Sequence, residues 1–450
     1  SIYLVNAKEK EIAGHPVYKT IKDIPEKVDL AVVTIPAAAI PDLIPRLKAK
    51  GIRSMLLITS GFSETGETGR KLERDITAKA EEAGILILGP NTMGICNPHH
   101  RFYCMAAHVR PQPGTTSLVA QSGNLGTQLL AFAEKEGIDI RAFCGSGNEA
   151  MITIEDYMHC CEVDDLTKTV VLYLESIKDG RRFFETAKRV GQKKPVIVLK
   201  GGRTDAGNRA AASHTGAMAS NLKIFNAACR QAGIIMAEHT MDILDLSAAF
   251  SSLPLPRNNR VAIITLGGGL GVVATDLCIE NGLTVPHLPR EIIQQIDKIL
   301  PPYWSRSNPI DLVGELDIKL PMMVTEELLR WEECDAVIHL GIVGRMPFVR
   351  KTIDSAITSD KNQDPVFLEA VSKAMHDSEY QFTERMVQLM ETYQKPVLGV
   401  YLLPDENMRT ISAVDSHRFK GVTFVTPERA VKALARMYEY RNWLNKEGID

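Results

Sequence analysis

The sequence has little net charge and few aromatic residues. Its 450 residues include 52 Lys and Arg against 55 Asp and Glu, a formal net charge of -3, and aromatic residues make up 6%. A balance this close to neutral argues against a surface for nucleic acid or for an anionic membrane. A phosphate group would therefore need a local site, built from backbone N–H groups and a few side chains.

Long apolar runs and metal-type cysteine spacings are also absent. No apolar run approaches the roughly eighteen residues of a membrane span, and no signal peptide is visible. The 8 cysteines form no CxxC pair and no zinc spacing, and most lie in apolar segments. We interpret the cysteines as reduced core residues of a cytoplasmic protein, and we expect no metal ligands. Together with the small net charge and the absence of long apolar runs, this predicts no membrane contact and no nucleic-acid partner.

What the sequence does contain is an alternation of apolar strands with helical segments. VDLAVVTIP (28–36), SMLLITSGF (54–62) and ILILGPN (85–91) are near-continuous apolar runs with helical stretches between them. Such runs are typical of a parallel sheet that helices cover on both faces. Similar sets follow further along the chain, and TVPHL (284–288) is expected to be one of their strands.

Two proline-marked segments divide this alternation. RPQPGTT (110–116) and SLPLPRNN (252–259) have the composition of linkers. The pattern therefore predicts an α/β protein made of three consecutive parallel-sheet domains. Their expected bounds are residues 1–110, 113–255 and 257–450.

The first of these domains begins unusually. It opens directly with a strand, SIYLVNAK (1–8), and continues with EIAGHPVYKTIKDIP (11–25), which we interpret as a loop. The strand and glycine-rich turn that start a mononucleotide-binding half do not precede them. Either the fold does without this unit, or the chain is truncated and the Rossmann-like domain is partial.

Glycine-rich turns follow two of the strands. Ser122, Gly123 and Asn124 come directly after SLVAQ and begin a helix, whose N–H groups and dipole suit an anion. A plain N-cap with a tight turn explains the same residues equally well. LGGGLGVVATDL (266–277) is similar to a dinucleotide fingerprint, but no acidic residue ends a strand about twenty positions later. An NAD-dependent oxidoreductase is therefore a weakly supported alternative.

The segment AAASHTGAMAS (210–220) sets His214 among small residues. A histidine used in chemistry needs such room, whereas an exposed loop histidine is the competing interpretation. Glu175 ends the apolar run TVVLYLE at the same predicted sheet edge. A carboxylate that binds one imidazole nitrogen leaves the other nucleophilic, although a glutamate here can also simply cap the next helix.

Five segments in order resemble the NDP-forming acyl-CoA synthetases, which are relatives of the succinyl-CoA synthetase α subunit and of ADP-forming acetyl-CoA synthetase. They are SLVAQSGNLG, GSGNEA, LYLESIKDGRRF, KPVIVLKGGRT and AAASHTGAMA. The likeness extends upstream through GPNTMGICNP and downstream to SNPIDLVG, over nearly the whole chain. It implies that a CoA-binding Rossmann-like domain is followed by two flavodoxin-like, succinyl-CoA synthetase-like domains.

The resemblance also implies a function. Members interconvert acyl-CoA, phosphate and a nucleoside diphosphate with a carboxylic acid, CoA and the triphosphate, through acyl phosphate and a phosphohistidine. His214 would carry the phosphoryl group beside Glu175, and Ser122, Gly123 and Asn124 would bind phosphate. The residues expected along coenzyme A are Val5, Asn6, Lys8, Thr34, Ile35, Pro36, Ser60, Gly61 and Phe62.

Other parts of the function would come from elsewhere. The family binds ADP or ATP, with Mg²⁺, in an ATP-grasp domain, and no segment after Thr426 is long enough to supply one. The resemblance therefore implies an ATP-grasp β subunit or fused domain, a hetero-oligomer or homo-oligomer, and a small carboxylic acid as substrate. The alternative is a CoA- or acyl-CoA-sensing regulatory module, related to the synthetase-like part of protein acetyltransferases; His214 and Glu175 favour the enzyme. Ala7, where the family usually has proline, is a departure.

Overall fold

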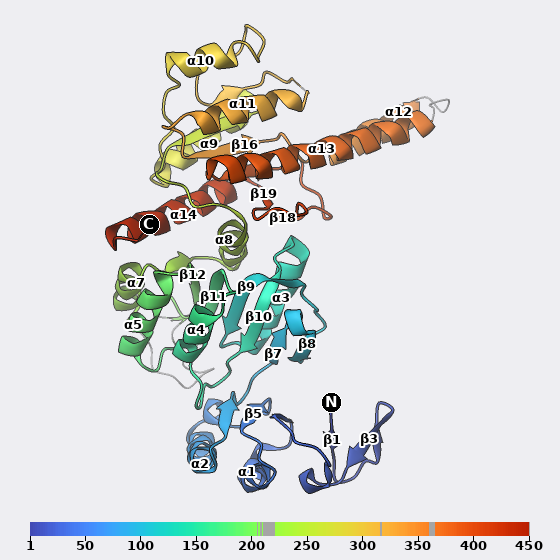
Figure 1. Cartoon of the computed structure of the whole chain (residues 1–450), viewed down its shortest axis with the longest axis vertical. Helices are drawn as coiled ribbons and strands as arrows, with labels where there is room; N and C mark the ends of the chain where they lie inside the picture. Colours follow the sequence, from blue (N-terminus) through green and yellow to red (C-terminus); the bar gives the residue numbers. More distant parts are fainter. Residues whose placement is uncertain (205, 208, 210–220, 316, 360–364, 450) are drawn as a thin grey trace. The chain divides into compact units, whose positions relative to one another are not determined.

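A computed structural model describes residues 1–204, 206–207, 209, 221–315, 317–359 and 365–449 (Figure 1). Contacts divide the chain into two compact units. The first comprises Ser1–Ala131 and Ile140–Met236, and the second comprises Phe132–Asp139 and Ala237–Asp450. We describe each unit by itself. The predicted boundary at 252–259 differs from the division between the units, and the domain bounds remain predictions.

The first unit begins with a small α/β layer. Its parallel sheet has the order β4-β5-β6 and packs against two helices. Helix α1 buries Ile40, Ile44 and Leu47, three or four residues apart, so that one helical face meets the sheet. The elements are β4 (Leu30–Val33), α1 (Ile40–Ala49), β5 (Ser54–Leu57), α2 (Glu67–Ala83) and β6 (Leu86–Leu88).

A separate three-stranded sheet precedes this layer. It consists of β1 (Leu4–Val5), β2 (Glu11–Ile12) and β3 (His15–Tyr18), in the order β1-β3-β2. The expectation of a loop over residues 11–25 was therefore wrong in part, because β2 and β3 form an antiparallel hairpin. Ala13 and Gly14 both have positive φ, 51° and 80°, which is the backbone that a two-residue hairpin turn requires.

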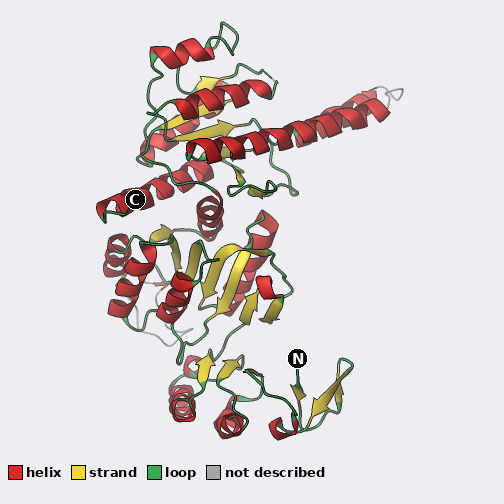
Figure 2. Ribbon diagram, viewed as in Figure 1, coloured by secondary structure: helices red, strands yellow, loops and turns green. Residues whose placement is uncertain are grey.

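A seven-stranded sheet forms the rest of the first unit, in the order β13-β12-β11-β9-β10-β7-β8. Strands β9 to β12 pair in parallel, and β7 and β8 add an antiparallel edge. Helices α4, α5 and α7 share one buried cluster with alternate residues of β11 and β12 (Figure 2). The bounds are β7 (Gly94–Asn97), β8 (Phe102–Met105), β9 (Pro113–Ala120), α3 (Gly123–Glu136), β10 (Ile140–Gly145), α4 (Ile154–Val163), β11 (Thr169–Leu174), α5 (Gly180–Gly191), β12 (Val196–Lys200), α7 (Leu222–Gln231) and β13 (Ile235–Ala237).

Two features of this sheet differ from the sequence interpretation. The segment expected to be a linker at 110–116 is in part strand, since β9 begins at Pro113. A proline is tolerated as the first residue of a strand, where it need not donate to the ladder. Strand β7 pairs with β10 and β8 pairs with β7, so both belong to this sheet, although the sequence placed residues 94–105 in the first domain.

The second unit contains a six-stranded sheet in the order β15-β14-β16-β17-β19-β18, parallel except for β18. Helices α12 and α13 pack on one another, and their far ends extend beyond the sheet (Figure 1). The bounds are α8 (Thr240–Ser252), β14 (Val261–Thr265), α9 (Gly268–Glu280), α10 (Arg290–Ile296), β15 (Ile310–Asp311), α11 (Lys319–Arg330), β16 (Ala336–Leu340), α12 (Met346–Ser359), α13 (Pro365–Tyr393), β17 (Val397–Val400), β18 (Ile411–Ser412), β19 (Gly421–Phe424) and α14 (Pro427–Lys446).

One expected strand of this unit does not form. TVPHL contributes only an isolated bridge between Thr284 and Arg260. Pro286 and Pro289 have no N–H to donate, so the segment cannot extend a ladder. The α/β class with parallel sheets is nevertheless confirmed in both units.

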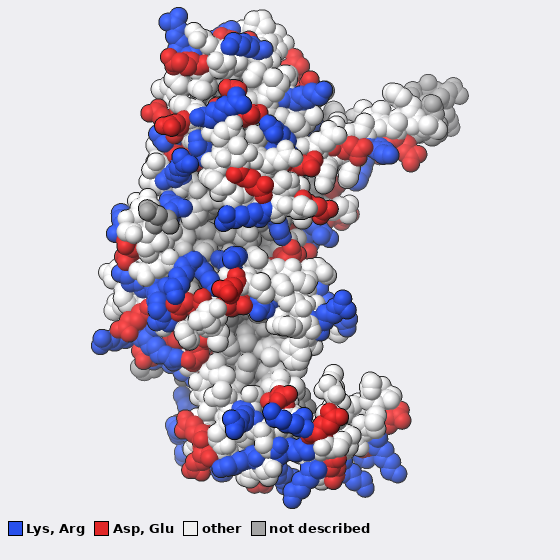
Figure 3. All heavy atoms as spheres, viewed as in Figure 1, with Lys and Arg blue, Asp and Glu red and all other residues white. Residues whose placement is uncertain are grey.

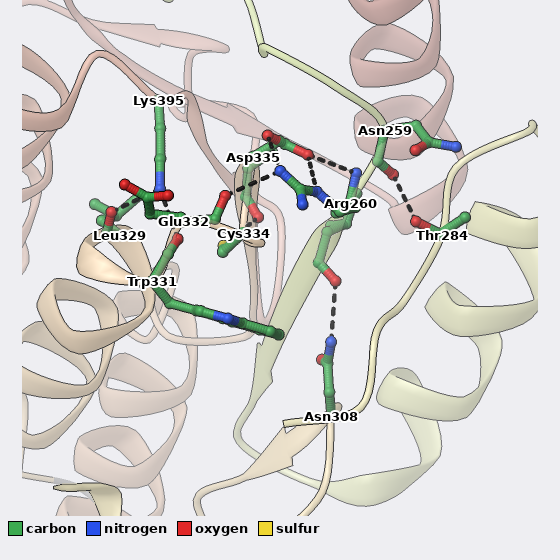
Figure 4. A network of polar contacts seen from close by, with 12 residues as sticks. Asn259, Arg260, Thr284, Asn308, Leu329, Trp331, Glu332, Cys334, Asp335 and Lys395 are labelled. Atoms are coloured by element: carbon green, nitrogen blue, oxygen red, sulfur yellow. Dashed lines mark hydrogen bonds and ion pairs between the residues drawn. The ribbon is translucent and has the colours of Figure 1, made fainter. Parts of the chain in front are cut away.

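A polar network fixes the amino ends of the strands in the second unit (Figure 4). Arg260, just before β14, donates to both carboxylate oxygens of Asp335, at 2.7 and 3.1 Å. Lys395 Nζ donates to the carbonyls of Leu329 and Trp331, which end α11, at 2.8 and 2.7 Å. Each of these cations therefore meets a carboxylate or the negative end of a helix dipole.

Candidate functional site

The turns that follow β9, β10, β11 and β12 lie together at the carboxyl edge of the seven-stranded sheet. Backbone hydrogen bonds join them: Gln121 N to Tyr173 O at 3.1 Å, Ser146 N to Ala120 O at 2.9 Å and Gly201 N to Leu174 O at 2.8 Å. Ligands of open α/β sheets collect at this edge. The edge therefore holds four of the segments that the sequence analysis singled out, QSGN, SGNEA, ES and GG.

The predicted phosphate residues occupy the start of α3. Gly123 is the first residue of the helix, and the Ser122 hydroxyl accepts from Leu125 N at 3.5 Å, which is a weak N-cap. A Cβ on Gly123 would lie 2.2 Å from Cγ of Met93, so only glycine admits that side chain. Asn124 is exposed. This geometry suits both the anion site and the plain tight turn, and phosphate binding remains a prediction.

Glu175 lies directly after β11, and the chain holds its backbone from both sides. Its N–H donates to Oε1 of Gln121 at 2.6 Å, and its carbonyl accepts from Lys200 Nζ at 2.8 Å. The Tyr173 hydroxyl approaches the carboxylate at 3.4 Å. Burial and the adjacent carboxylate raise the pKa of Tyr173 to about 12, so this hydroxyl stays a donor at neutral pH. Burial lowers the pKa of Lys200.

His214 lies outside the described residues, together with the rest of 210–220. The distance between His214 and Glu175 is therefore not defined, and the pairing of the two residues stays a prediction. The described chain leads toward this segment from β12 through Gly201, whose added Cβ would come within 2.7 Å of the Tyr173 hydroxyl and 3.6 Å of Cγ of Glu175. The strand that precedes the segment containing His214 in the sequence thus ends beside Glu175.

The residues predicted to bind CoA fall into two groups. Thr34, Ile35 and Pro36 follow β4, and Ser60, Gly61 and Phe62 follow β5; the Thr59 hydroxyl, which donates to Ile35 O at 2.7 Å, joins the two turns. The remaining residues, Val5, Asn6 and Lys8, lie on or just after β1, in the separate small sheet. Asn6 Oδ1 accepts from Lys8 N at 2.9 Å, and Val5 is 43% exposed.

Two of these positions are already engaged within the chain. The Phe62 side chain is fully buried, so only its backbone can face a ligand. The N–H groups of Gly61 and Phe62 both donate to Oε1 of Glu64, at 2.5 and 3.1 Å. The other carboxylate oxygen of Glu64 accepts from Nδ2 of Asn148 at 2.6 Å. Burial raises the pKa of Glu64, but the bonds from Asn148 and Gly61 outweigh it and hold the pKa below its usual value.

Sequence reasoning missed several residues at this edge. Asn148 links the small α/β layer to the large sheet, since its Nδ2 contacts both Glu64 and Glu73 Oε2 and its N–H donates to Pro90 O. Gln121 and Glu149 are bonded to one another within the large sheet's carboxyl edge, at 2.9 Å. In the second unit, Asp311 ends the strand beside β14 and lies 3.2 Å from an added Cβ on Gly268. The quoted motifs SLVAQSGNLG, GSGNEA and SNPIDLVG contain these residues, but they do not show which residues make contact with one another.

Three family models match the chain in order. They are a CoA binding domain over residues 1–98, a succinyl-CoA ligase like flavodoxin domain over 113–250 and a Ligase-CoA domain over 261–358. The α subunit of acetate–CoA ligase [ADP-forming] I of Pyrococcus furiosus is 33% identical over 99% of this chain and 90% of its own length. The α subunit of the second such ligase of that organism is 37% identical over 76% and 74%.

The chain belongs to the NDP-forming acyl-CoA synthetase family. A solved structure agrees with this membership. The dinucleotide-forming acetyl-coenzyme A synthetase 1 of Ca. Korarchaeum cryptofilum, in complex with phosphate and ADP, has a TM-score of 0.82 and 30% sequence identity, and the match covers 99% of this chain and 90% of that one. The resemblance drawn from the sequence is thereby confirmed.

Family membership gives the carboxyl edge its chemical context, an acid–thiol ligase. The acetate–CoA ligase [ADP-forming] of Methanocaldococcus jannaschii is 38% identical over 70% of this chain and 44% of its own length. Among the described residues, no helix is both long and apolar enough to cross a bilayer. On the face in Figure 3, basic and acidic side chains are interspersed, in line with the small net charge.

Proposed function

We propose that this chain works with an ATP-grasp β subunit or fused domain as an ADP-forming acyl-CoA synthetase in the cytoplasm. The observation that supports this most is the junction of the start of α3 with Glu175, which the Gln121 side chain connects. It ties the residue before a helix N-terminus, which suits phosphate, to the backbone of Glu175, whose carboxylate is suited to orient an imidazole. A small carboxylic acid such as acetate is the proposed substrate.

The proposed reaction has three steps. Phosphate displaces CoA from the acyl carbonyl, so that the thioester bond breaks and the acyl–oxygen bond of acyl phosphate forms. A nitrogen of His214 then takes the phosphoryl group and releases the carboxylate. Finally the phosphoryl group passes from His214 to ADP, which restores the imidazole and gives ATP. Each step is reversible, so the same residues also activate an acid at the expense of ATP.

Each group of this chain has one proposed role. Ser122, Gly123 and Asn124 hold the phosphate through the N-terminus of α3, and Glu175 holds one imidazole nitrogen so that the other attacks. The turns after β4 and β5 and the segment after β1 hold CoA. Among the described residues, no group of three or more His, Cys, Asp or Glu side chains lies close enough for a metal. We therefore propose Mg²⁺ only together with the nucleotide on the ATP-grasp part.

The test is an assay of the complete enzyme. The chain is co-purified with its ATP-grasp partner, and ATP-dependent loss of free CoA is measured over carboxylic acids of increasing size. We expect turnover that requires both parts, CoA and one class of acid. Binding of acyl-CoA without turnover of any acid would contradict the proposal and favour the regulatory module instead.

A further inference from the structure

The side-chain amide of Gln121 makes four hydrogen bonds across the carboxyl edge. Its Nε2 donates to Glu149 Oε1 and to Ser176 O, both at 2.9 Å. Its Oε1 accepts from the N–H groups of Glu175 at 2.6 Å and Ser176 at 2.9 Å. These bonds use the full capacity of a carboxamide, two donors and two acceptors. They tie the last residue before Ser122 to the chain directly after β11.

Glu149 and the Ser176 carbonyl require the same orientation of this amide. A carbonyl and an ionised carboxylate only accept, so both require Nε2 on their side and leave Oε1 to the two N–H groups. The reversed amide would place Nε2 against the N–H groups of Glu175 and Ser176. The Gln121 amide therefore connects the Glu175 backbone to a carboxylate that lies 28 residues beyond Gln121 in the sequence.

Glu149 itself is buried in an unusual way. Its side chain is 2% exposed, and its other hydrogen-bond donors are the Ser146 hydroxyl at 2.8 Å and Ile154 N at 3.4 Å. Lys178 Nζ is near but donates to the backbone carbonyls of Asn148 and Glu149, at 2.8 and 2.6 Å. The donors to the carboxylate, from Gln121, Ser146 and Ile154, are neutral, and burial raises the pKa of Glu149. Such burial is unfavourable for stability, which suggests a role other than stability.

We infer that Gln121 and Glu149 are positioning residues for the phosphoryl-transfer site. They hold the N–H groups of Glu175 and Ser176 and so set the direction of the Glu175 carboxylate relative to the start of α3. The inference rests on the proposed function, because it gives Gln121 and Glu149 the role of orienting Glu175. It goes further by naming two residues that would act on the reaction without touching the substrate.

The test uses the enzyme complete with its ATP-grasp part. Gln121→Glu replaces Nε2 by oxygen and sets two carboxyl groups against each other without changing the side-chain shape. We expect kcat to fall at least about tenfold, as for other displacements of a catalytic group by about an ångström, while the KM for CoA stays within about twofold. The double variant Gln121→Glu with Glu149→Gln restores a donor–acceptor pair between the two positions. It should recover part of kcat, because the contact with position 149 returns while the bond to Ser176 O stays lost.

Glu155→Gln is the matched control. Glu155 is also a 2% exposed glutamate of this sheet layer, on α4, and its hydrogen bond to the Thr153 hydroxyl lies outside the Gln121 network. Its kcat should stay within about twofold of the parent value. Melting temperatures of all variants show which of them fold. If Gln121→Glu does not fold, Glu149→Gln alone replaces it in the test, and this variant should lower kcat while the KM for CoA stays unchanged.

The outcomes separate this inference from the proposed function. If Glu175→Gln lowers kcat but Gln121→Glu and Glu149→Gln leave it unchanged, the positioning role is wrong and the proposed function stands. If the double variant is no better than Gln121→Glu, the orientation argument is wrong as well. If Glu175→Gln itself has the parent kcat, the role proposed for Glu175 fails, and the inference fails with it.

Discussion

Two amide side chains hold the edges of the two large sheets, and their partners differ in kind. Asn308, in the second unit, accepts from Ile263 N at 3.0 Å and donates to the carbonyls of Val261 and Pro286 at 3.0 and 3.1 Å. All of these partners are backbone groups, two of them in β14 and one at Pro286. Gln121, at a carboxyl edge in the first unit, also contacts backbone groups but adds the buried carboxylate of Glu149.

The charges around the two amides differ in the same way. Near Asn308, Asp335 is paired with Arg260, and Lys395 faces the carbonyl end of α11. Near Gln121, the groups of Gln121, Ser146 and Ile154 that donate to the Glu149 carboxylate are neutral. A stabilising network needs each buried charge to be paired with an opposite charge. A buried charge without such a pair is tolerated where it serves a functional site. We therefore expect the amino-edge network to govern stability and the carboxyl-edge network to govern activity.

The largest effect should come from Glu175→Gln. It keeps the shape of the side chain but removes the charge that holds the imidazole, so kcat should fall about a thousandfold, within the range for an acid–base partner. The free energy of unfolding should change by less than about 0.5 kcal/mol, because the side chain is only partly buried. Steady-state kinetics and urea unfolding on the same preparation measure both. A large loss of stability with little loss of kcat would erase the contrast between the edges.

Asp335→Asn should give the opposite pattern. It leaves Arg260 without the carboxylate it donates to, and Asp335 is 1% exposed. Breaking a buried pair destabilises a protein by about 3 kcal/mol or more, and the partial exposure of Arg260 favours the lower figure. Where the variant is folded, kcat should remain within about twofold. Equal losses in Asp335→Asn and in the charge-free pair Arg260→Met with Asp335→Leu would contradict the pairing argument.

Asn308→Asp should have a smaller effect on stability. The variant retains the acceptor for Ile263 N but loses the donors to Val261 O and Pro286 O, leaving backbone carbonyls opposite a carboxylate. We expect a loss of about 1–3 kcal/mol, as for unsatisfied buried polar groups, with unchanged KM and kcat. Gln121→Glu is the same chemical change at the other edge. If both variants lost activity to the same extent, the two amides would not differ in role.

The smallest effect should appear in the pH dependence of stability. Burial raises the pKa of Glu149, so above pH 4.5 the unfolded chain releases a proton that the folded chain still holds, and stability falls as the pH rises through that interval. Burial also raises the pKa of Glu162, but bonds from Lys193 and Arg189 outweigh it and lower the pKa to about 2; its stabilisation is present above pH 4.5 and disappears as the pH falls toward 2.

Urea unfolding of Glu149→Gln and Glu162→Gln against the parent chain measures these slopes. Relative to the parent, Glu149→Gln should gain stability as the pH rises above 4.5, and Glu162→Gln should lose less stability than the parent as the pH falls below 4.5. The same slope of stability against pH in both variants would show that neighbouring charges offset the burial of the two carboxylates to the same extent.

The sequence predicted the parts of this fold that depend on local pattern. Apolar runs identified β4, β5 and β11, and the glycine-rich turn after SLVAQ correctly marked the start of α3 at Gly123. It failed where pairing partners decide the outcome. The β2–β3 hairpin depends on Ala13 having positive φ, and β7 becomes a strand by pairing with β10, where Cys96 faces Phe143.

The candidate site shows the same limit. Motifs indicated that Ser122 and Glu175 matter, since each follows an apolar strand and sits where ligands of parallel sheets collect. No spacing rule joins Gln121 to Glu149 or to Ser176, because those contacts follow from the order β11-β9-β10 in the sheet. Strand order is a property of the tertiary fold, so the contacts of Gln121 with Glu149 and Ser176 could not be predicted from the motifs.

The most direct test of the account is transfer of phosphate to His214. The complete enzyme is incubated with γ-labelled ATP and Mg²⁺, and the label on this chain is followed through acid and base. The account predicts a label that acid removes and base does not, absent in His214→Asn and formed more slowly in Glu175→Gln. An equally acid-labile label on His214→Asn, at the parent level, would contradict the phosphohistidine and with it the function proposed for this edge of the sheet.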